Sequence, residues 1–336
     1  MDRLPDDVGG IEEFRSRLET FLLEGPPHLT RAEVAERVGV SVADASRLWR
    51  ALGFPDVGDD VRVFADIDVE TLGMAVSLER RGILDEVSQA AVTRTVGQAM
   101  SRLAEWQVGF LFQLLTQSGS EALVGSDRSV VDFVEEMVPT LQRFHTYAWR
   151  RHLAAYAARA LAGTGVDRSG DTVVGFVDIS GYTSLTRKIG AEELGRVLER
   201  FESLAADLVA TYGGRVIKSL GDEILFIDDD ALGAVRLALQ IVASCNEDPE
   251  MPDVRAGLAY GPTMGRLGDV FGSTVNLASR LTSVAKPSSV LVDRTLADVL
   301  RADDGADDLI VRPLARVSVR GFAHLQPWLV RPVASR

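Results

Sequence analysis

Lysine is nearly absent from this chain of 336 residues, which has Lys188, Lys218 and Lys286 against 33 arginines. Cysteine occurs once, at Cys245, which excludes an intrachain disulfide framework and gives no sign of secretion. No stretch reaches the roughly 20 uninterrupted apolar residues of a membrane span. The first residues are polar and acidic, unlike a signal peptide. These absences predict a cytoplasmic protein without a membrane span.

Acidic residues outnumber basic ones by 49 to 36, which gives a formal net charge of −13. Such a chain repels nucleic acid and anionic lipid in general, so a phosphate ligand must be met by local cations or by metal. Apolar residues make up 46%, enough for a sizeable core, and the length suits two domains. In a chain so rich in arginine, the lysine at position 218 is mildly informative, since a compact ammonium serves where a guanidinium does not fit, and chance is the alternative explanation.

The first half of the chain has apolar residues at helical spacing. We predict an all-helical domain over residues 1–161 and a polar, glycine-containing linker over 162–170. Thr30 and Glu33 form a capping-box pattern at the start of one helix. The expected helices are 11–23, 31–38, 42–52, one starting near Asp68, 85–115 and 130–161.

Residues 30–52 have the pattern of a helix–turn–helix and faintly resemble the start of MerR-type DNA-binding domains. Their charge argues against DNA binding. Residues 1–165 contain 17 arginines, no lysine and 25 acidic residues, a net charge of −8. The second helix offers only Arg47 and Arg50, beside Asp44, and two cations are few for contacting the phosphates of DNA. We therefore expect a helical module that has this shape without binding nucleic acid.

From residue 171 to 336 the pattern changes to alternating strands and helices, which is typical of an α+β or mixed α/β domain. A hairpin is expected around Gly221 and Asp222. The expected strands are 173–178, 215–220, 223–227, 254–260, 290–292, and two near 309–319 and 327–331. The expected helices are 191–212, 231–246, 274–285 and 293–301.

Two aspartates in this half each end or adjoin an apolar strand pattern. Asp178 closes the run VVGFVD, and Asp222 follows VIKSLG at the hairpin. An acid at the end of an apolar strand is costly unless a cation meets it. Hard oxygen ligands that converge at adjacent strand ends suit Mg²⁺ or Mn²⁺. Taken singly, each aspartate is more simply explained as a turn or cap residue.

Further polar residues recur near these aspartates. Lys218 precedes Asp222 by four residues, and Asp269 lies in the segment RLGDVFG. Asn276 and Arg280 are spaced i, i+4, which places both on one face of a helix. In isolation such a pair usually belongs to a solvated helix face.

The segments FVDISGYTSLT, IKSLGDEILF and LGDVFGSTVNLASRL, in this order and spacing, resemble the catalytic domain of class III nucleotidyl cyclases over roughly residues 171–332. The ordered set is specific, whereas a single GD or ASR means little. The resemblance implies a ferredoxin-like α+β fold and a head-to-tail homodimer with sites at the interface. It also implies conversion of a nucleoside triphosphate into its 3′,5′-cyclic monophosphate and pyrophosphate.

By this resemblance Asp178 and Asp222 are the metal-binding aspartates, Ile179 belongs to the same site, and two divalent cations, Mg²⁺ or Mn²⁺, are the cofactors. Lys218 and Asp269 match the purine-selecting pair, and lysine with aspartate marks adenine, so ATP is the expected substrate. The chemistry agrees, because lysine only donates and suits adenine N1, while a carboxylate accepts from the exocyclic amine.

Asn276 and Arg280 match the pair that orients the ribose and stabilises the transition state. Arg320 falls where a basic residue contacts the triphosphate. A second phosphate-binding arginine of some members has no clear counterpart, because Pro262 occupies the aligned position and Arg266 is only a nearby candidate. The implied mechanism is two-metal phosphoryl transfer. The two aspartates would come from one subunit and the remaining groups from the other, so a monomer would be inactive.

Two other functions stay open from the sequence. One is a guanylate cyclase, which Lys218 and Asp269 argue against. The other is a DNA-binding regulator that senses nucleotides through a cyclase-like domain. Formation of a cyclic product from ATP would indicate an adenylate cyclase, formation from GTP a guanylate cyclase, and formation from neither the DNA-binding regulator.

The whole arrangement also resembles soluble actinobacterial cyclases whose helical N-terminal domain is autoinhibitory, responds to pH and accommodates a fatty acid. The resemblance implies regulation in cis, with pH or a fatty acid as the signal. His145 and His152 are seven residues apart on the last helix of the N-terminal half, so they lie on one face. Histidine titrates near neutral pH, and its protonation can bias the packing of a helix. An ordinary surface or interface role is the alternative for both.

Overall fold

The structure is a computed structural model that describes residues 8–117, 127–162, 171–266, 268–319 and 321–333. The chain divides into two compact units, Met1–Arg151 and His152–Arg336. Within the described ranges, no helix combines the length and the hydropathy that crossing a bilayer requires.

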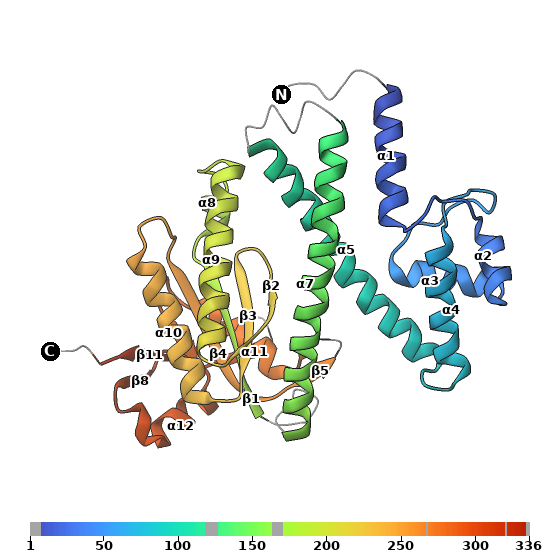
Figure 1. The fold of residues 1–336 in the computed structure, drawn as a ribbon. Helices are drawn as coiled ribbons and strands as arrows, with labels where there is room; N and C mark the ends of the chain where they lie inside the picture. Colours follow the sequence, from blue (N-terminus) through green and yellow to red (C-terminus); the bar gives the residue numbers. More distant parts are fainter. Residues whose placement is uncertain (1–7, 118–126, 163–170, 267, 320, 334–336) are drawn as a thin grey trace. The chain divides into compact units, whose positions relative to one another are not determined.

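The first unit is helical, as the sequence predicts (Figure 1). Its helices are α1 (Val8–Leu22), α2 (Arg31–Val38), α3 (Val42–Leu52), α4 (Asp66–Arg80), α5 (Glu86–Gln117) and the larger part of α7 (Asp127–Ala162), which continues into the second unit. The capping box is confirmed: the Thr30 hydroxyl accepts from the Glu33 N–H, and the Glu33 carboxylate accepts from the Thr30 N–H. Gly39 then ends α2 with φ at 74°.

A small core holds α2, α3 and α4 together. Trp49 and Phe64 pack with their ring centroids 4.5 Å apart, and Leu29 pairs with Phe64 as an isolated antiparallel bridge. The predicted helix–turn–helix shape is therefore present. α4 begins at Asp66, and the Asp68 carboxylate in its first turn accepts from the N–H of the N-cap residue Ala65.

A buried arginine ties the loop after α3 to this core. Arg31 is only 8% exposed, and its guanidinium donates to the Ser46 hydroxyl at 2.9 Å and to the Val57 carbonyl. It also pairs with Asp56 at 2.7 Å. Because a buried guanidinium is costly unless its donors are satisfied, these contacts fix the course of the loop.

The second unit is built on a mixed seven-stranded sheet in the order β2-β3-β1-β4-β7-β11-β8. Its strands are β1 (Asp171–Ile179), β2 (Arg215–Ser219), β3 (Glu223–Asp228), β4 (Val254–Pro262), β7 (Val290–Val292), β8 (Leu309–Pro313) and β11 (Trp328–Pro332). β1 is antiparallel to both of its neighbours, β3 and β4, while β4 and β7 are parallel. This confirms the α+β class predicted for this half.

Helices cover both faces of the sheet. The helices of this unit are α8 (Tyr182–Leu185), α9 (Ala191–Thr211), α10 (Ala231–Glu247), α11 (Ser273–Val284) and α12 (Arg294–Ala302). Along β1, Val173 and Val177 point to the core that includes α9, α10 and α12, and Val174 and Phe176 point to the core that includes α11. This two-residue alternation places Asp178 on the face of the sheet that α11 covers.

The C-terminal strands differ from the prediction. The expected strand near 309–319 is two strands, β8 and β9 (Val317–Val319), because Pro313 removes a donor at the end of the first. β9 pairs with β10 (Phe322–Leu325) in a separate hairpin, and Gly321 adopts φ of 88° between them. A second unpredicted hairpin joins β5 (Met264–Arg266) to β6 (Asp269–Phe271).

Gly257 on β4 sets the distance between the sheet and α11. A Cβ at this position would lie 2.2 Å from the backbone nitrogen of Thr282 on α11. No side chain fits there unless the helix moves. The position of α11, which carries Asn276 and Arg280, therefore depends on this glycine.

We predict that Gly257→Ala lowers the free energy of unfolding by about 1–3 kcal/mol and lowers catalytic activity, because α11 must shift away from β4. Chemical denaturation and product formation test this. Gly195→Ala is the matched control, because a Cβ there meets nothing within 4 Å on an exposed helix position. It should stabilise by up to about 1 kcal/mol and leave activity unchanged. An equal response of the two variants would contradict this account of Gly257.

Candidate active site

Asp178 stands in the middle of a row of charged residues across three strands. Its register partners are Arg255 on β4 and Glu223 on β3. The guanidinium of Arg255 donates from Nε to Asp178 Oδ2 at 2.8 Å, and Nη2 lies 2.6 Å from the same oxygen. Burial raises the pKa of the Asp178 carboxyl, although Arg255 acts in the opposite direction.

Asp222 is brought beside Asp178 by the turn between β2 and β3. Gly221 adopts φ of 75° in this turn, and the Ile179 N–H donates to the Asp222 carbonyl at 2.9 Å. That hydrogen bond links the end of β1 to the turn. The structure therefore brings together the two aspartates and Ile179, and their role as a metal site stays a prediction.

Glu223 is a third carboxyl that the sequence analysis missed. Burial, followed by the charges of Asp178 and Asp222, raises the pKa of Glu223 to about 7. The one sequence signal that could have indicated Glu223 as part of the site is its place directly after Asp222, at the start of a strand. Its position opposite Asp178 depends on the strand register, which the sequence pattern does not specify.

These residues have the donor chemistry that a hard divalent cation requires. Within the described part of the chain, Asp178 Oδ1 and the Asp222 carboxylate have no hydrogen bond or ion pair, so both are available as ligands. Ile179 can offer only its backbone carbonyl. No group of three or more His, Cys, Asp or Glu side chains in the described ranges is arranged around a metal position, so the candidate set is two carboxylates and a carbonyl.

Lys218 and Asp269 meet directly. Lys218 Nζ on β2 lies 2.7 Å from Asp269 Oδ2 at the start of β6, and both side chains are about one-third exposed. Burial acts to raise the pKa of Asp269, but the hydrogen bonds from Lys218 and from the Val270 N–H bring it below its ordinary value. A cationic donor and an anionic acceptor therefore lie side by side at a partly exposed position, and their purine-selecting role stays a prediction.

Asn276 and Arg280 lie one turn apart on α11, as predicted. Asn276 is exposed and Arg280 is half-buried. Among the described residues, neither side chain has a hydrogen bond or ion pair, so the structure does not join them to the two aspartates. Arg320 lies outside the described residues, and so does the side chain of Arg266.

The two histidines of α7 have different surroundings. His145 Nε2 lies 2.7 Å from Gln107 Nε2 on α5, so the neutral ring accepts a hydrogen bond from the amide. Protonation would reverse the roles, because the ring would then donate and the amide would have to turn its oxygen toward the ring. The ring of His152 packs near Tyr156, with centroids 6.4 Å apart.

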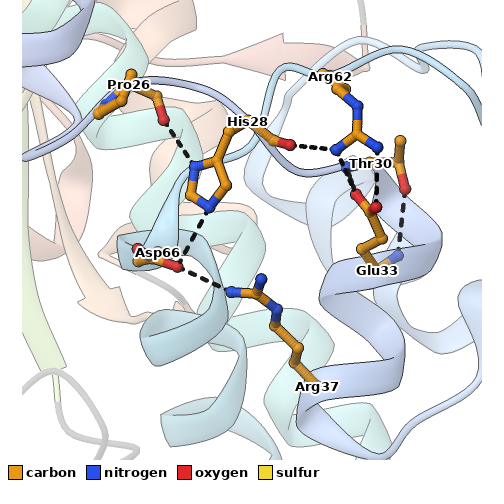
Figure 2. A network of polar contacts seen from close by, with 7 residues as sticks. All are labelled: Pro26, His28, Thr30, Glu33, Arg37, Arg62 and Asp66. Carbon is orange, nitrogen blue, oxygen red and sulfur yellow. Dashed lines mark hydrogen bonds and ion pairs between the residues drawn. The ribbon is translucent and has the colours of Figure 1, made fainter.

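His28, which the sequence analysis missed, also has polar partners (Figure 2). Its Nδ1 lies 2.9 Å from the Pro26 carbonyl, which requires a proton on that nitrogen. Its Nε2 lies 3.7 Å from Asp66, whose same oxygen accepts from Arg37 at 3.0 Å. Arg62 contacts both the His28 carbonyl and Glu33 in the same network. The pairing of His28 with Asp66 comes from tertiary structure and has no signal in the local sequence.

The two arginines of α3 differ, because Arg50 is exposed and has no ion pair in the described ranges, whereas Arg47 is paired. Arg47 on α3 pairs with Asp44 at 3.0 Å and with Glu86 at 2.9 Å. A hollow of about 260 Å³ nearby is lined by Trp49, Phe54 and other apolar residues together with charged ones. Nothing in its lining singles out a fatty acid, which stays a prediction.

A protein of Streptomyces coelicolor named adenylate cyclase is 39% identical to this chain over 354 aligned residues, which cover 97% of this chain and 92% of the relative. The chain belongs to the class III adenylate cyclase family. The family model described as "Adenylate and Guanylate cyclase catalytic domain" matches residues 166–331 of this cyclase. A pH-sensitive adenylate cyclase of Mycobacterium tuberculosis is 31% identical, over 91% of this chain and 85% of its own length.

Among solved structures, the adenylyl cyclase CyaB from P. aeruginosa aligns with a TM-score of 0.42 and 23% identity, over 48% of this cyclase and 95% of that chain. The match to the S. coelicolor relative spans nearly the whole chain. The helical unit of this class III cyclase is therefore shared with that relative, and the likeness is not confined to the catalytic domain.

Proposed function

We propose that the protein converts ATP into 3′,5′-cyclic AMP and pyrophosphate. The observation that carries this proposal is the 2.7 Å contact between Lys218 Nζ and Asp269 Oδ2, in a chain that also brings Asp178 and Asp222 together at neighbouring strand ends. Adenine presents an acceptor, N1, beside a donor, the exocyclic amine. The ammonium and the carboxylate are complementary to that edge.

The same pair disfavours guanine. Guanine presents a donor at N1 and an acceptor at O6, so the ammonium would face a donor and the carboxylate would face an acceptor. Each mismatched group loses a hydrogen bond to a charged partner, which costs about 1–3 kcal/mol. The charges of Lys218 and Asp269 therefore favour ATP over GTP.

Divalent cations, two per site, complete the proposed site. Asp178, Asp222 and the Ile179 carbonyl would hold Mg²⁺ or Mn²⁺. When bound, these ions lower the pKa of the ribose 3′-hydroxyl and neutralise the leaving pyrophosphate. The hydrogen bond between Ile179 and Asp222 supports this assignment, because it holds the two strand ends in register.

The remaining groups act on the nucleotide itself. Asn276 orients the ribose, and Arg280 stabilises the charge that develops on the α-phosphate. Their side chains have no partner among the described residues, which leaves their donors available to a ligand. Arg320 is proposed to contact the triphosphate.

We further propose that the active form is a homodimer in which each site combines both chains. Asp178 and Asp222 would come from one protomer, and the pairs Lys218–Asp269 and Asn276–Arg280 from its partner. This arrangement is supported by the lack of side-chain contact between the aspartates and Arg280 in the described part of one chain.

Lys218→Met should lower kcat/KM for ATP roughly ten- to a hundredfold, because a hydrogen bond from a charged donor is lost. The measurement is cyclic nucleotide formation from ATP and, separately, from GTP, by the full chain with Mn²⁺. Wild-type protein should prefer ATP, and the variant should lose most of that preference.

The matched control for this test is Lys188→Met, since Lys188 is exposed and has no ion pair in the described ranges. It should leave both rates unchanged. A wild-type preference for GTP would support a guanylate cyclase instead. Absence of any cyclic product would contradict the enzymatic proposal and would favour the DNA-binding alternative.

Mixing two inactive variants tests the shared site. Asp178→Asn and Arg280→Ala should each abolish activity, but their mixture should recover roughly a quarter of the wild-type rate, because half of the dimers are mixed and each has one intact site. A mixture of Asp178→Asn with Asp222→Asn is the control. It should recover nothing, since both substitutions fall on the same half of each site. Recovery in both mixtures, or in neither, would contradict the shared site.

We also propose that the helical residues 1–161 regulate the catalytic residues 171–336 in cis, through pH or a fatty acid, with 162–170 as the linker. The pH-sensitive relative of M. tuberculosis matches 91% of this chain, which supports a pH response here. The contact between His145 and Gln107 gives that response a physical basis, because only the neutral ring accepts the hydrogen bond from the amide.

The double variant His145→Gln, His152→Gln should flatten the dependence of activity on pH between about 5.5 and 8, where histidine titrates. Full pH–activity profiles of the intact chain measure this. His324→Gln, at an exposed position of β10, is the control and should keep the wild-type profile. The double variant could instead keep the wild-type pH–activity profile while His28→Gln changed that profile. The sensor would then lie in the His28 network, and the assignment to α7 would be wrong.

A further inference from the structure

Arg255 occupies a position between the proposed metal site and the helix that carries Asn276 and Arg280. It lies on β4 directly opposite Asp178 on β1. Neighbouring residues Val254 and Ala256 point into the core on the other face, so Arg255 points to the face of α11. Its side chain is 28% exposed and that of Asp178 is 15% exposed, so solvent only partly screens the pair.

One edge of the guanidinium holds a single oxygen of Asp178. Nε and Nη2 approach Oδ2 at 2.8 and 2.6 Å, and Oδ1 has no partner in the described part of the chain. A carboxylate held in this way has a fixed plane and one oxygen left free. This is the geometry that a metal-binding carboxylate needs from an outer partner.

The other edge of the guanidinium contacts the end of α11. Nη1 donates to the Ser283 carbonyl at 3.3 Å and to the Ala285 carbonyl at 3.5 Å. These groups belong to the last turn and the cap of the helix, where carbonyls lack helical partners and a cation is favourable. Arg280 lies less than one turn earlier on the same helix.

We infer that Arg255 is a positioning residue that orients Asp178 toward the cation and fixes the end of α11 relative to β1. This inference rests on the proposed function of Asp178 as a metal ligand. Lysine cannot replace Arg255 fully, because its single ammonium lacks the planar fork that reaches both the carboxylate and the helix carbonyls. A purely structural ion pair would have the same contacts but no effect on metal binding.

The test compares Arg255→Gln and Arg255→Lys with wild-type full-length protein. Mn²⁺ binding is followed by the electron paramagnetic resonance signal of free Mn²⁺, in the presence of 3′-deoxy-ATP, which lacks the attacking hydroxyl. Arg255→Gln should raise the Mn²⁺ concentration for half-saturation roughly ten- to a hundredfold, the usual cost of losing an outer partner of a metal ligand. Arg255→Lys should recover part of this loss.

Arg200→Gln is the matched control, because Arg200 pairs with Asp248 and Glu250 away from the candidate site. It should leave Mn²⁺ binding unchanged, and thermal unfolding of every variant shows how much protein is folded. Binding by folded Arg255→Gln as tight as wild type, or tighter, would overturn the inference, since Arg255 would then be structural or would compete with the cation. If wild-type protein bound Mn²⁺ but formed no cyclic nucleotide, the proposed function would fail, and the binding comparison would still decide the role of Arg255.

Discussion

The antiparallel pairing of β1 with both β3 and β4 is the constraint on which the candidate site depends. It places Arg255, Asp178 and Glu223 side by side across three strands on one face of the sheet. Side chains alternate between the two faces of a strand. Because Val173 and Val177 point into the core on one face, Asp178 must point to the other face. A slip of one residue would exchange the two faces, so the hydrophobic core and the carboxylate cluster are specified by the same register.

The strands of the seven-stranded sheet and the long helices could be predicted because their signals are local. The capping box of Thr30, the run that ends at Asp178 and the i, i+4 pair on α11 each fit within a few residues. Glu223, Arg255 and His28 were missed because their partners are distant in sequence or depend on strand register. The hairpins β5–β6 and β9–β10 were missed because strands of three or four residues show too few alternations to be distinguished from loops.

The helical unit shows why a local pattern does not settle function. The helix–turn–helix shape follows from Thr30, Gly39 and Ser41, which determine where two short helices begin and end. DNA binding would require several free cations on α3, but Arg47 pairs with two acids and leaves only Arg50 free among the described residues of this helix. The shape is therefore compatible with a packing role in which the same helices transmit a signal. Such a role requires two packings of similar free energy, and histidine contacts between helices are one means of shifting their balance with pH.

The charges of the candidate site explain why the proposed reaction would depend on metal. In the described residues Lys218 is paired with Asp269 and Arg255 with Asp178, so each of these cations is already neutralised. Asp222 adds negative charge, and Glu223, whose pKa burial raises to about 7, adds a further part of a charge. Among the described cations of the proposed site, only Arg280 has no partner. A nucleoside triphosphate is a polyanion, and a site of this charge would repel it. Divalent cations held by the carboxylates would make the local electrostatic potential positive. They would then attract the triphosphate in place of free basic residues, of which the described part of the site has few.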